Sequence, residues 1–511
     1  MSEVTLYLRG GSVVDVMSGT SRLADIAVDN ERILAVGAGD ELTPLIGERT
    51  VVVELSGKTI VPGLIDDHVH LMSTGLMLQE LDLDGTGTVS EVLELVAAEA
   101  KKQPRGTLIR GWRLQENLLA ENRFPTMKEL DGVAPRHYVQ LIRADGHSST
   151  VNGLTLRYLG YDTGLAGVES EGGTPTGVLR GEPHYQALLK VGELAPPESR
   201  RMALEKACAA AIRVGLTSIQ CLEGGRFSSE DDVLAVMAAG PELPVRTLVW
   251  YQTTDIARVK ELGLPRIGGC ILVDGAPGSY TGALFEPYAD NPSTNGLLYF
   301  TDEDLNAFVL AAHRGGFQIA MHATCQRAIE QLLRAYEHAL DVEPKSDHRF
   351  RVEHCYGLPT ADQFERMGRR AVICSTQPAF LHYRLDMYRR RFGHRWPQVH
   401  PHRLALEHGV TIAGGSDSFV TPMYPLLGIH CAVNHPVEGQ RVTVAEALRW
   451  FTINAAYAVF EEADKGSIAP GKLADFVVLG QDILTIESKN IKDIPIDLTI
   501  VGGRVRYRRN L

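Results

Sequence analysis

The apolar residues are arranged differently at the two ends of the chain and in its middle. Residues 1 to about 60 contain short apolar runs separated by turns at near-regular spacing, at 6–8, 12–16, 25–28, 32–36 and 51–55. The end of the chain repeats this texture, with runs at 475–479 and 498–501 and a Gly-Gly turn between 501 and 504. Short strands at such spacing are typical of a β-sandwich. We therefore predict that 1–60 and 466–511 join in one small β-sandwich domain.

The middle of the chain alternates between helical and strand patterns. A helical stretch at 199–214 is followed by a strand at 216–221, and a second pair occupies 302–314 and 317–322. Further strands are predicted at 349–354, 371–375 and 410–417. This alternation, without a glycine fingerprint for nucleotides, favours a (β/α)8 TIM barrel over an open sheet. We place the barrel at 61–465, with an insertion at about 72–198 over its active-site end.

Composition narrows the class of protein. The chain has 511 residues, a net charge of -12 and seven cysteines without a C-x-x-C pair. The charge argues against nucleic-acid and anionic-membrane partners, and the scattered cysteines indicate a reducing compartment. Neither a signal peptide nor an apolar run of membrane-spanning length is seen in the sequence. We expect a cytoplasmic protein that acts on a small molecule, and leave open whether it is a homo-oligomer.

Candidate metal ligands fall where the predicted barrel strands end. His68 and His70 follow the apolar run 59–62, and residues two apart on a strand point to the same side. His322, His354 and Asp417 each end a later predicted strand, and all barrel strands end at the catalytic face. Imidazoles bind zinc-like ions and leave a position for water. A metal site is favoured over buried histidines paired with carboxylates. For Asp417, a role as metal ligand and proton shuttle is favoured over that of a helix N-cap.

Several motifs resemble those of the amidohydrolase superfamily, and within it amidohydrolase family 3. They are Pro-Gly-Leu-Ile-Asp-Asp-His-Val-His at 62–70, Arg-Ala-Asp-Gly-His at 143–147, Val-Asp-Gly at 273–275, Met-His-Ala at 321–323, Val-Glu-His at 352–354, Ser-Thr-Gln-Pro at 375–378, Gly-Gly-Ser-Asp at 414–417 and the closing segment 466–479. The resemblance implies a metal-bearing barrel that hydrolyses amide-like bonds. It matches His68, His70, His322 and His354 to metal ligands and Asp417 to the catalytic aspartate.

The chain departs from this family pattern at Cys270. Many relatives carry a lysine four residues before the Asp-Gly of the middle strand, where its carbamate bridges two metals. Here that position is Cys270, and no lysine occurs from residue 261 to 344. Cys270 either bridges as a thiolate or packs in the core next to a single metal. Glu223 is a weaker candidate for the bridge.

A second departure bears on the reaction. Deaminases of the superfamily commonly carry a glutamate three residues after the histidine that corresponds to His322, and this chain has Cys325. The difference favours hydrolysis of an acyclic C–N bond in an amide, N-acyl, urea or carbamate group. An aminohydrolase acting on an amidine-like ring carbon is the alternative enzyme. A non-catalytic barrel that binds a ligand is the alternative outside enzymes, and the complete ligand set argues against it.

Candidates for substrate contact are less specific. By resemblance the loop at 143–147 faces the site, and His147 either donates to a tetrahedral oxyanion or is a structural loop histidine. The substrate-binding candidates are Arg143, Asp145, Arg180, Tyr280, Gln377 and His382. We expect one or two divalent ions, most simply zinc. The exact substrate is not evident from the sequence.

Overall fold

The computed structural model describes residues 4–196, 198–226 and 228–509, and their contacts divide the chain into two compact units. The first unit holds the chain up to residue 69, residues 208–222 and the chain from residue 240 onward. The second holds residues 70–207 and 223–239, and thus the whole of the predicted insertion. Over the described ranges, no helix combines the length and apolar composition needed to cross a membrane.

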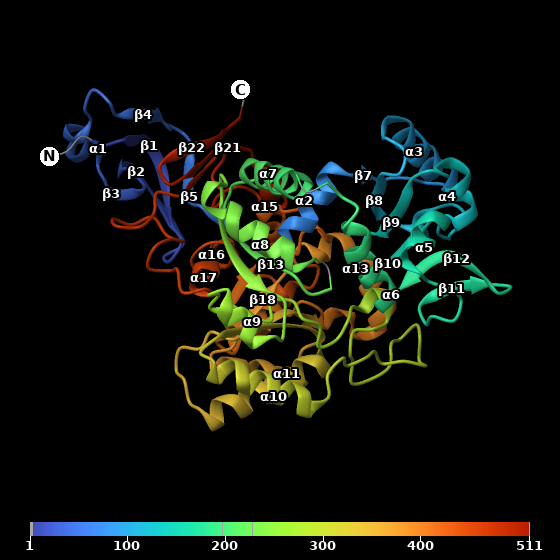
Figure 1. Ribbon diagram of the computed structural model, residues 1–511. Helices are drawn as coiled ribbons and strands as arrows, with labels where there is room; N and C mark the ends of the chain where they lie inside the picture. Colours follow the sequence, from blue (N-terminus) through green and yellow to red (C-terminus); the bar gives the residue numbers. More distant parts are fainter. Residues whose placement is uncertain (1–3, 197, 227, 510–511) are drawn as a thin grey trace. The chain divides into compact units, whose positions relative to one another are not determined.

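Both ends of the chain lie in one eight-stranded sheet of the first unit (Figure 1). Its strands are β1 (Leu6–Asp15), β2 (Thr20–Asp29), β3 (Arg32–Gly37), β4 (Val51–Glu54), β5 (Thr59–Pro62), β20 (Phe476–Leu479), β21 (Ile496–Val501) and β22 (Arg504–Arg508). The central strand β5 pairs in parallel with β1 and antiparallel with β20. It therefore hydrogen-bonds the N-terminal strands to the C-terminal ones.

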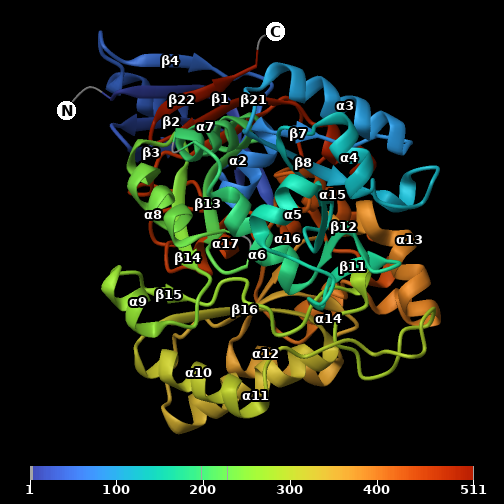
Figure 2. The ribbon, with the colours of Figure 1, turned by 45° about the vertical axis from the view of Figure 1, so that its right-hand side comes forward.

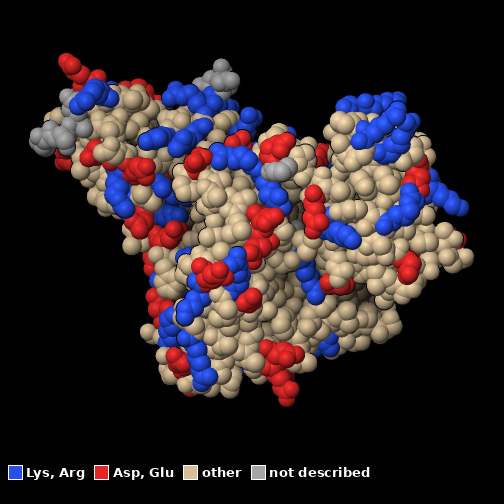
Figure 3. Space-filling model, viewed as in Figure 1, with Lys and Arg blue, Asp and Glu red and all other residues tan. Residues whose placement is uncertain are grey.

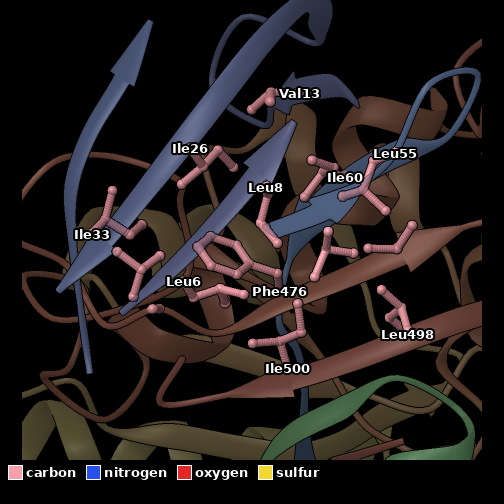
Figure 4. Close-up of a cluster of buried hydrophobic side chains, with 14 of the residues drawn as sticks. Leu6, Leu8, Val13, Ile26, Ile33, Leu55, Ile60, Phe476, Leu498 and Ile500 are labelled. Atoms are coloured by element: carbon pink, nitrogen blue, oxygen red, sulfur yellow. The ribbon is translucent and has the colours of Figure 1, made fainter. Parts of the chain in front are cut away.

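The core of this sheet is built from both ends of the chain (Figure 4). Leu8 and Ile26 come from the N-terminal strands, and Phe476, Leu498 and Ile500 from the C-terminal ones, all of them buried. Burying apolar side chains from the two ends in one cluster stabilises their association. The prediction that the two ends of the chain join in one sheet is confirmed. Their separation from the barrel as a β-sandwich domain stays a prediction, because this sheet and the barrel belong to the same compact unit.

A second eight-stranded sheet forms a nearly closed barrel. Its strands, in order, are β6 (Leu64–Val69), β13 (Leu216–Glu223), β14 (Arg246–Tyr251), β15 (Arg266–Ile267), β16 (Gln318–Cys325), β17 (Arg351–Gly357), β18 (Ile373–Thr376) and β19 (Ile412–Gly414). The described pairings are parallel, and a bridge between Val69 and Ser418 joins the last strand's extension to the first. The predicted (β/α)8 barrel is confirmed.

A glycine allows the first and last strands of the barrel to meet. A Cβ added to Gly415 would lie 2.8 Å from the backbone nitrogen of His68 and 2.6 Å from a carboxylate oxygen of Asp67. The backbone N–H of Asp417 donates to the carbonyl oxygen of His68 across the same seam, at 2.8 Å. This close approach brings the end of β19 against His68.

Helices of the first unit connect and cover the barrel strands. They include α9 (Ile256–Glu261), α10 (Asp302–Arg314), α11 (Gln326–Val342), α12 (Ala361–Arg370), α13 (Phe380–Phe392), α14 (His402–Glu407), α15 (Pro425–Val433), α16 (Val444–Trp450) and α17 (Ile453–Tyr457). Helices α10, α11 and α12 pack side by side (Figure 2). Capping boxes begin α12 at Thr360 with Gln363 and α16 at Thr443 with Glu446.

The second unit contains a six-stranded sheet of its own. Its strands are β7 (Leu81–Asp82), β8 (Leu108–Leu114), β9 (Tyr138–Arg143), β10 (Ser148–Val151), β11 (Val168–Glu171) and β12 (Thr174–Arg180), ordered β11-β12-β10-β9-β8-β7. Its helices are α2 (Leu71–Gln79), α3 (Val89–Lys102), α4 (Met127–Val133), α5 (Gly153–Leu159), α6 (Glu182–Gly192) and α8 (Glu230–Ala239), while α7 (Glu198–Arg213) continues into the first unit. On the face shown in Figure 3, acidic and basic side chains are interspersed.

Candidate metal centre

Five predicted ligands belong to the first unit and come from five places on its barrel. His68 lies on β6, His322 on β16 and His354 on β17, while Cys270 follows β15 and Asp417 follows β19. Strands β16 and β17 each continue three residues past their histidine, because they still pair there. The prediction that these two histidines end their strands is therefore wrong in detail, and so is the same prediction for Asp417, which lies three residues beyond the end of β19. The two histidines lie within the strands, on the side toward the carboxyl ends.

The structure brings these side chains together. The Sγ atom of Cys270 lies 3.6 Å from Nδ1 of His322 and 3.4 Å from Nε2 of His354. The Nε2 atom of His68 lies 3.4 Å from a carboxylate oxygen of Asp417. One ligand atom each from His68, Cys270 and His354 lie within 4.8 Å of one another. All five side chains are buried.

These separations fit a divalent ion. Zinc–nitrogen and zinc–sulfur bonds of about 2.0–2.1 and 2.3 Å place two ligands of one tetrahedral ion about 3.5 Å apart. The sulfur–nitrogen and nitrogen–oxygen separations above agree with that value. Imidazole and thiolate ligands also match the preference of zinc-like ions. The residues present can therefore hold such an ion without a change of fold.

Two of the histidines are oriented by partners on their outer ring nitrogens. Nδ1–H of His68 donates to Glu353 at 2.6 Å, and Nδ1–H of His354 donates to the Oε1 atom of Gln377 at 2.7 Å. Both acceptors are buried. Metal-binding histidines are characteristically held in this way, because the bond fixes the tautomer and the ring plane. The lone pair of Nε2 then faces the cluster in each ring.

His322 is oriented by backbone and hydroxyl groups. Its Nε2–H lies 3.1 Å from the carbonyl oxygen of Gly275 and 2.9 Å from Oγ1 of Thr324, which leaves Nδ1 for the cluster. Asp274, in the Val-Asp-Gly motif, is more distant from the ring at 3.5 Å. Its carboxylate accepts the backbone N–H groups of Thr324 and Cys325 at 2.8 and 3.0 Å. Asp274 thus fixes the strand that carries His322.

The backbone is unusual at two of the ligands. His354 and Asp417 have φ angles of 74° and 55°, in the left-handed region that residues other than glycine rarely adopt. Successive strand residues normally point to opposite faces. Glu353 contacts His68 while the next residue, His354, contacts Cys270, so the turned backbone brings both side chains inside the barrel. Such strained residues concentrate at functional sites.

The cluster also perturbs proton affinities. Burial alone raises the pKa of the Cys270 thiol, but the adjoining His68 and His354 bring it well below its ordinary value. The same balance acts on Glu353, where Arg351 and His68 outweigh burial and lower the pKa. Burial raises the pKa of Asp274 to about 6, partly offset by His322. Cys270 is thus in an environment that favours the thiolate, the form that binds metal.

His70 and Glu223 belong to the second unit, next to its junctions with the first. His70 follows β6 directly, forms the N-cap of α2, and accepts the hydroxyl of Thr74 at its carbonyl oxygen at 2.8 Å. Glu223 accepts the backbone N–H of Met72 at 3.0 Å and the hydroxyl of Ser228 at 3.2 Å. Burial raises the pKa of Glu223 to about 7. Ligand roles for both residues stay predictions.

The second unit also holds the loop predicted to contact substrate. Arg143 forms ion pairs with Asp145 and Glu116, and a backbone N–H at His147 donates to Asp145 at 3.1 Å. The His147 ring is hydrogen-bonded to the hydroxyl of Tyr185. Arg180, another substrate-binding candidate in this unit, is half-exposed and forms an ion pair with Glu169. Their roles toward substrate stay predictions.

The remaining substrate-binding candidates lie in the first unit. The hydroxyl of Tyr280 accepts from Arg391 at 2.6 Å, and the guanidinium lies 3.8 Å from the ring centre. His382 is exposed on α13, edge-on to Tyr383. Gln377 has the contact with His354 described above, which gives it a role that the sequence did not indicate. Binding of substrate by these three residues stays a prediction.

Sequence reasoning gave no role to Arg351 and Glu353. Glu353 is part of the Val-Glu-His motif, yet only its histidine was singled out. The signal was the charged pair two residues apart in an otherwise apolar strand, next to a predicted ligand. Lone charges are almost never fully buried, so a strand carrying two of them indicates a buried ion pair.

A parallel barrel that gathers histidines, a cysteine and an aspartate at one buried point is typical of metal-dependent hydrolases. The chain belongs to the amidohydrolase family, whose sequence profile matches residues 51–507. It is 30% identical to the protein LONG AFTER FAR-RED 3 of Arabidopsis thaliana, over 98% of this chain and 91% of that protein. It is 26% identical to the N-substituted formamide deformylase of Arthrobacter pascens, over 99% and 98% of the two chains. The crystal structure of an uncharacterized metal-dependent hydrolase from Pyrococcus furiosus shares the fold, with a TM-score of 0.76, 24% identity and coverage of 94% and 100%.

Proposed function

We propose that this protein hydrolyses a non-peptide C–N bond in a small molecule, of the amide, N-acyl, urea or carbamate type. The observation that carries the proposal is the convergence of His68, Cys270, His322, His354 and Asp417 at one buried point of the barrel. The deformylase relative acts on N-substituted formamides by its name, and those are N-acyl compounds. Cys325, where the deaminases carry glutamate, supports an acyclic substrate over a ring.

The chain's own residues divide the work. The histidines, Cys270 and Asp417 would hold a divalent ion, which would supply a Lewis acid that activates water and polarises a carbonyl. The Asp417 carboxylate takes the proton of the attacking water and delivers it to the leaving nitrogen as the C–N bond breaks. The hydrogen bonds that His68 donates to Glu353 and His354 donates to Gln377 hold the two rings with their Nε2 atoms toward the ligand cluster. We assign to His147 the donor to the carbonyl oxygen as it gains charge.

Three finer points belong to the same proposal. We infer zinc because imidazole and thiolate ligands together suit it. We infer a cytoplasmic protein because the seven cysteines are buried and free, as a reducing compartment favours. We propose His70 as a further metal ligand because it matches the family pattern. We also propose a small-molecule substrate and no nucleic-acid partner.

The test is hydrolysis of a panel of N-substituted formamides, N-acyl amides, ureas and carbamates by the metal-loaded protein. At saturating metal, Asp417→Asn should lower kcat by about 10²- to 10⁴-fold, the usual contribution of a general acid–base group, because the amide oxygen can still coordinate but cannot take up a proton. Asp386→Asn, the same change at an exposed position of α13, is the control. Turnover of amidine rings in place of this panel, or full activity in Asp417→Asn, would refute the proposal.

A further inference from the structure

A fully buried arginine lies inside the barrel beside the candidate metal centre. Nε–H and a terminal N–H of Arg351 donate to the two carboxylate oxygens of Glu353 at 2.7 and 3.0 Å. Other terminal N–H groups donate to the carbonyl oxygen of Asp67 at 2.9 Å and to the side chain of Gln220. The guanidinium also lies 4.9 Å from the ring centre of Trp250. Each of its three guanidinium nitrogens therefore donates at least one hydrogen bond.

Glu353 connects this arginine to a metal ligand. One carboxylate oxygen accepts both from Arg351 and from Nδ1–H of His68, the latter at 2.6 Å. Neither carboxylate nor guanidinium is exposed. A buried charge is costly unless it is paired and hydrogen-bonded, and a barrel core has no general need for one. The three residues form a chain of charge-assisted hydrogen bonds that ends on the ring of His68.

His68 differs in this respect from the other two histidines. Nδ1–H of His354 donates to the neutral Gln377, and Nε2–H of His322 to the carbonyl oxygen of Gly275. Of these three rings, His68 is the one that donates a short hydrogen bond, of 2.6 Å, to a carboxylate, that of Glu353. An ionised acceptor makes a stronger hydrogen bond and raises the ligand strength of the opposite nitrogen. His68 is thus the ring whose donor strength depends on a buried charge pair.

We propose that Arg351 and Glu353 are positioning residues for metal binding: Arg351 holds the Glu353 carboxylate in place as an anion, and Glu353 fixes and strengthens His68 as a ligand. This inference rests on the proposed metal-dependent function and adds two residues to it. Arg351 acts through Glu353, and the double-mutant cycle below separates this route from its hydrogen bond to the carbonyl oxygen of Asp67, the residue before His68. Neither side chain belongs to the proposed set of metal ligands.

The test measures metal affinity directly, by competition between the protein and a chromogenic chelator for Zn²⁺. Glu353→Gln, which keeps the shape but removes the charge, should weaken Zn²⁺ binding about 10- to 100-fold, as is usual for outer partners of metal ligands. The visible spectrum of the Co²⁺-loaded variant should change as well, because the ligand field at His68 changes. Tyr336→Phe is the control: it removes a hydroxyl that bonds the backbone of Arg351 at 2.8 Å and leaves the side-chain pair intact.

A double-mutant cycle tests the order of action. If Arg351 acts through Glu353, adding Arg351→Met to Glu353→Gln should weaken Zn²⁺ binding by less than twofold more, whereas Arg351→Met alone should weaken it strongly. Circular dichroism of the metal-free proteins establishes that each variant is folded. Should Glu353→Gln not fold, Glu353→Asp replaces it and should weaken Zn²⁺ binding by about two- to tenfold, because the charge is kept and the contact lengthened; an affinity equal to that of the wild type would then overturn the inference.

The outcomes separate the two hypotheses. Folded Glu353→Gln with the affinity and Co²⁺ spectrum of the wild type would overturn this inference and leave the hydrolase proposal intact. Wild type that binds Zn²⁺ but hydrolyses none of the panel would overturn the proposed function and leave the inference standing. Wild type that binds neither Zn²⁺ nor Co²⁺ would overturn both.

Discussion

Replacement of Cys270 decides how the metal centre is built. Its sulfur lies 3.4 and 3.6 Å from the ligand nitrogens of two histidines, so a bound ion would lie within bonding distance of all three atoms. Apparent zinc-binding free energies of about 10–16 kcal/mol, divided over the four positions of a tetrahedral ion, give roughly 2.5–4 kcal/mol for each ligand. That is a loss of about 10²- to 10³-fold in affinity when one ligand is removed.

The assay combines elemental analysis of metal per chain with chelator competition, on wild type, Cys270→Ser and Cys270→Ala. Cys431→Ser, the same change at another buried cysteine, is the control. A second readout is the thiolate-to-metal charge-transfer band of the Co²⁺ form, which should disappear in both Cys270 variants. Serine should retain more affinity than alanine, because its hydroxyl oxygen still offers a weak ligand.

Each result has a distinct meaning. Two ions in wild type that fall to one in Cys270→Ala would make the thiolate a bridge. One ion in wild type, bound less tightly in the variants, would make Cys270 a ligand of a single ion. Unchanged content, affinity and spectrum in Cys270→Ser would refute the reasoning and leave Cys270 as core packing.

Two further predictions concern stability. Gly415→Ala should lower the free energy of unfolding by about 1–3 kcal/mol and weaken metal binding, because its methyl group would overlap the backbone nitrogen of His68 at 2.8 Å. Thermal unfolding checks this, with Gly439→Ala, where the space around the added methyl group is open, as the control. Equal melting temperatures for the two variants would contradict the prediction. Acid should destabilise the fold through His435, because burial lowers the pKa of its ring to about 4 whereas a histidine in the unfolded chain titrates near 6.5. The free energy of unfolding is therefore unaffected by this ring above pH 6.5 and decreases by about 3 kcal/mol as the pH falls to 4. Urea unfolding of His435→Gln should show a weaker pH dependence over that range, and an unchanged one would refute the assignment.

The sequence was sufficient for the parts of the fold that repeat. Helix–strand alternation predicted the barrel because helical stretches alternate with short strands rich in apolar residues. The order of the strands then gathers His322, His354 and Asp417. Strand ends were less accurate, because β16 and β17 keep pairing for three residues beyond their histidines. The second unit was visible only as excess length. Its short strands β10 and β11 have too few residues for a clear pattern.

Other features depend on contacts that no local pattern contains. The hydrogen bond from His68 to Glu353 joins residues 285 positions apart. The positive φ of His354 cannot be inferred from a residue that normally avoids it. The sequence around Cys270 does not distinguish a metal-binding cysteine from one that packs in the core. Its position beside the ring nitrogens of two histidines favours the role of a metal ligand.

The shared sheet of the two chain ends has a consequence for synthesis on the ribosome. Strand β5 needs β20 as its partner, and their paired residues Thr59 and Leu479 are 420 positions apart. At about 5–20 residues per second, the N-terminal strands wait roughly 20 to 80 s before that partner emerges. During this interval one edge of β5 is unpaired and open to other chains. The nascent protein therefore has its greatest need of chaperone protection before β20 is made.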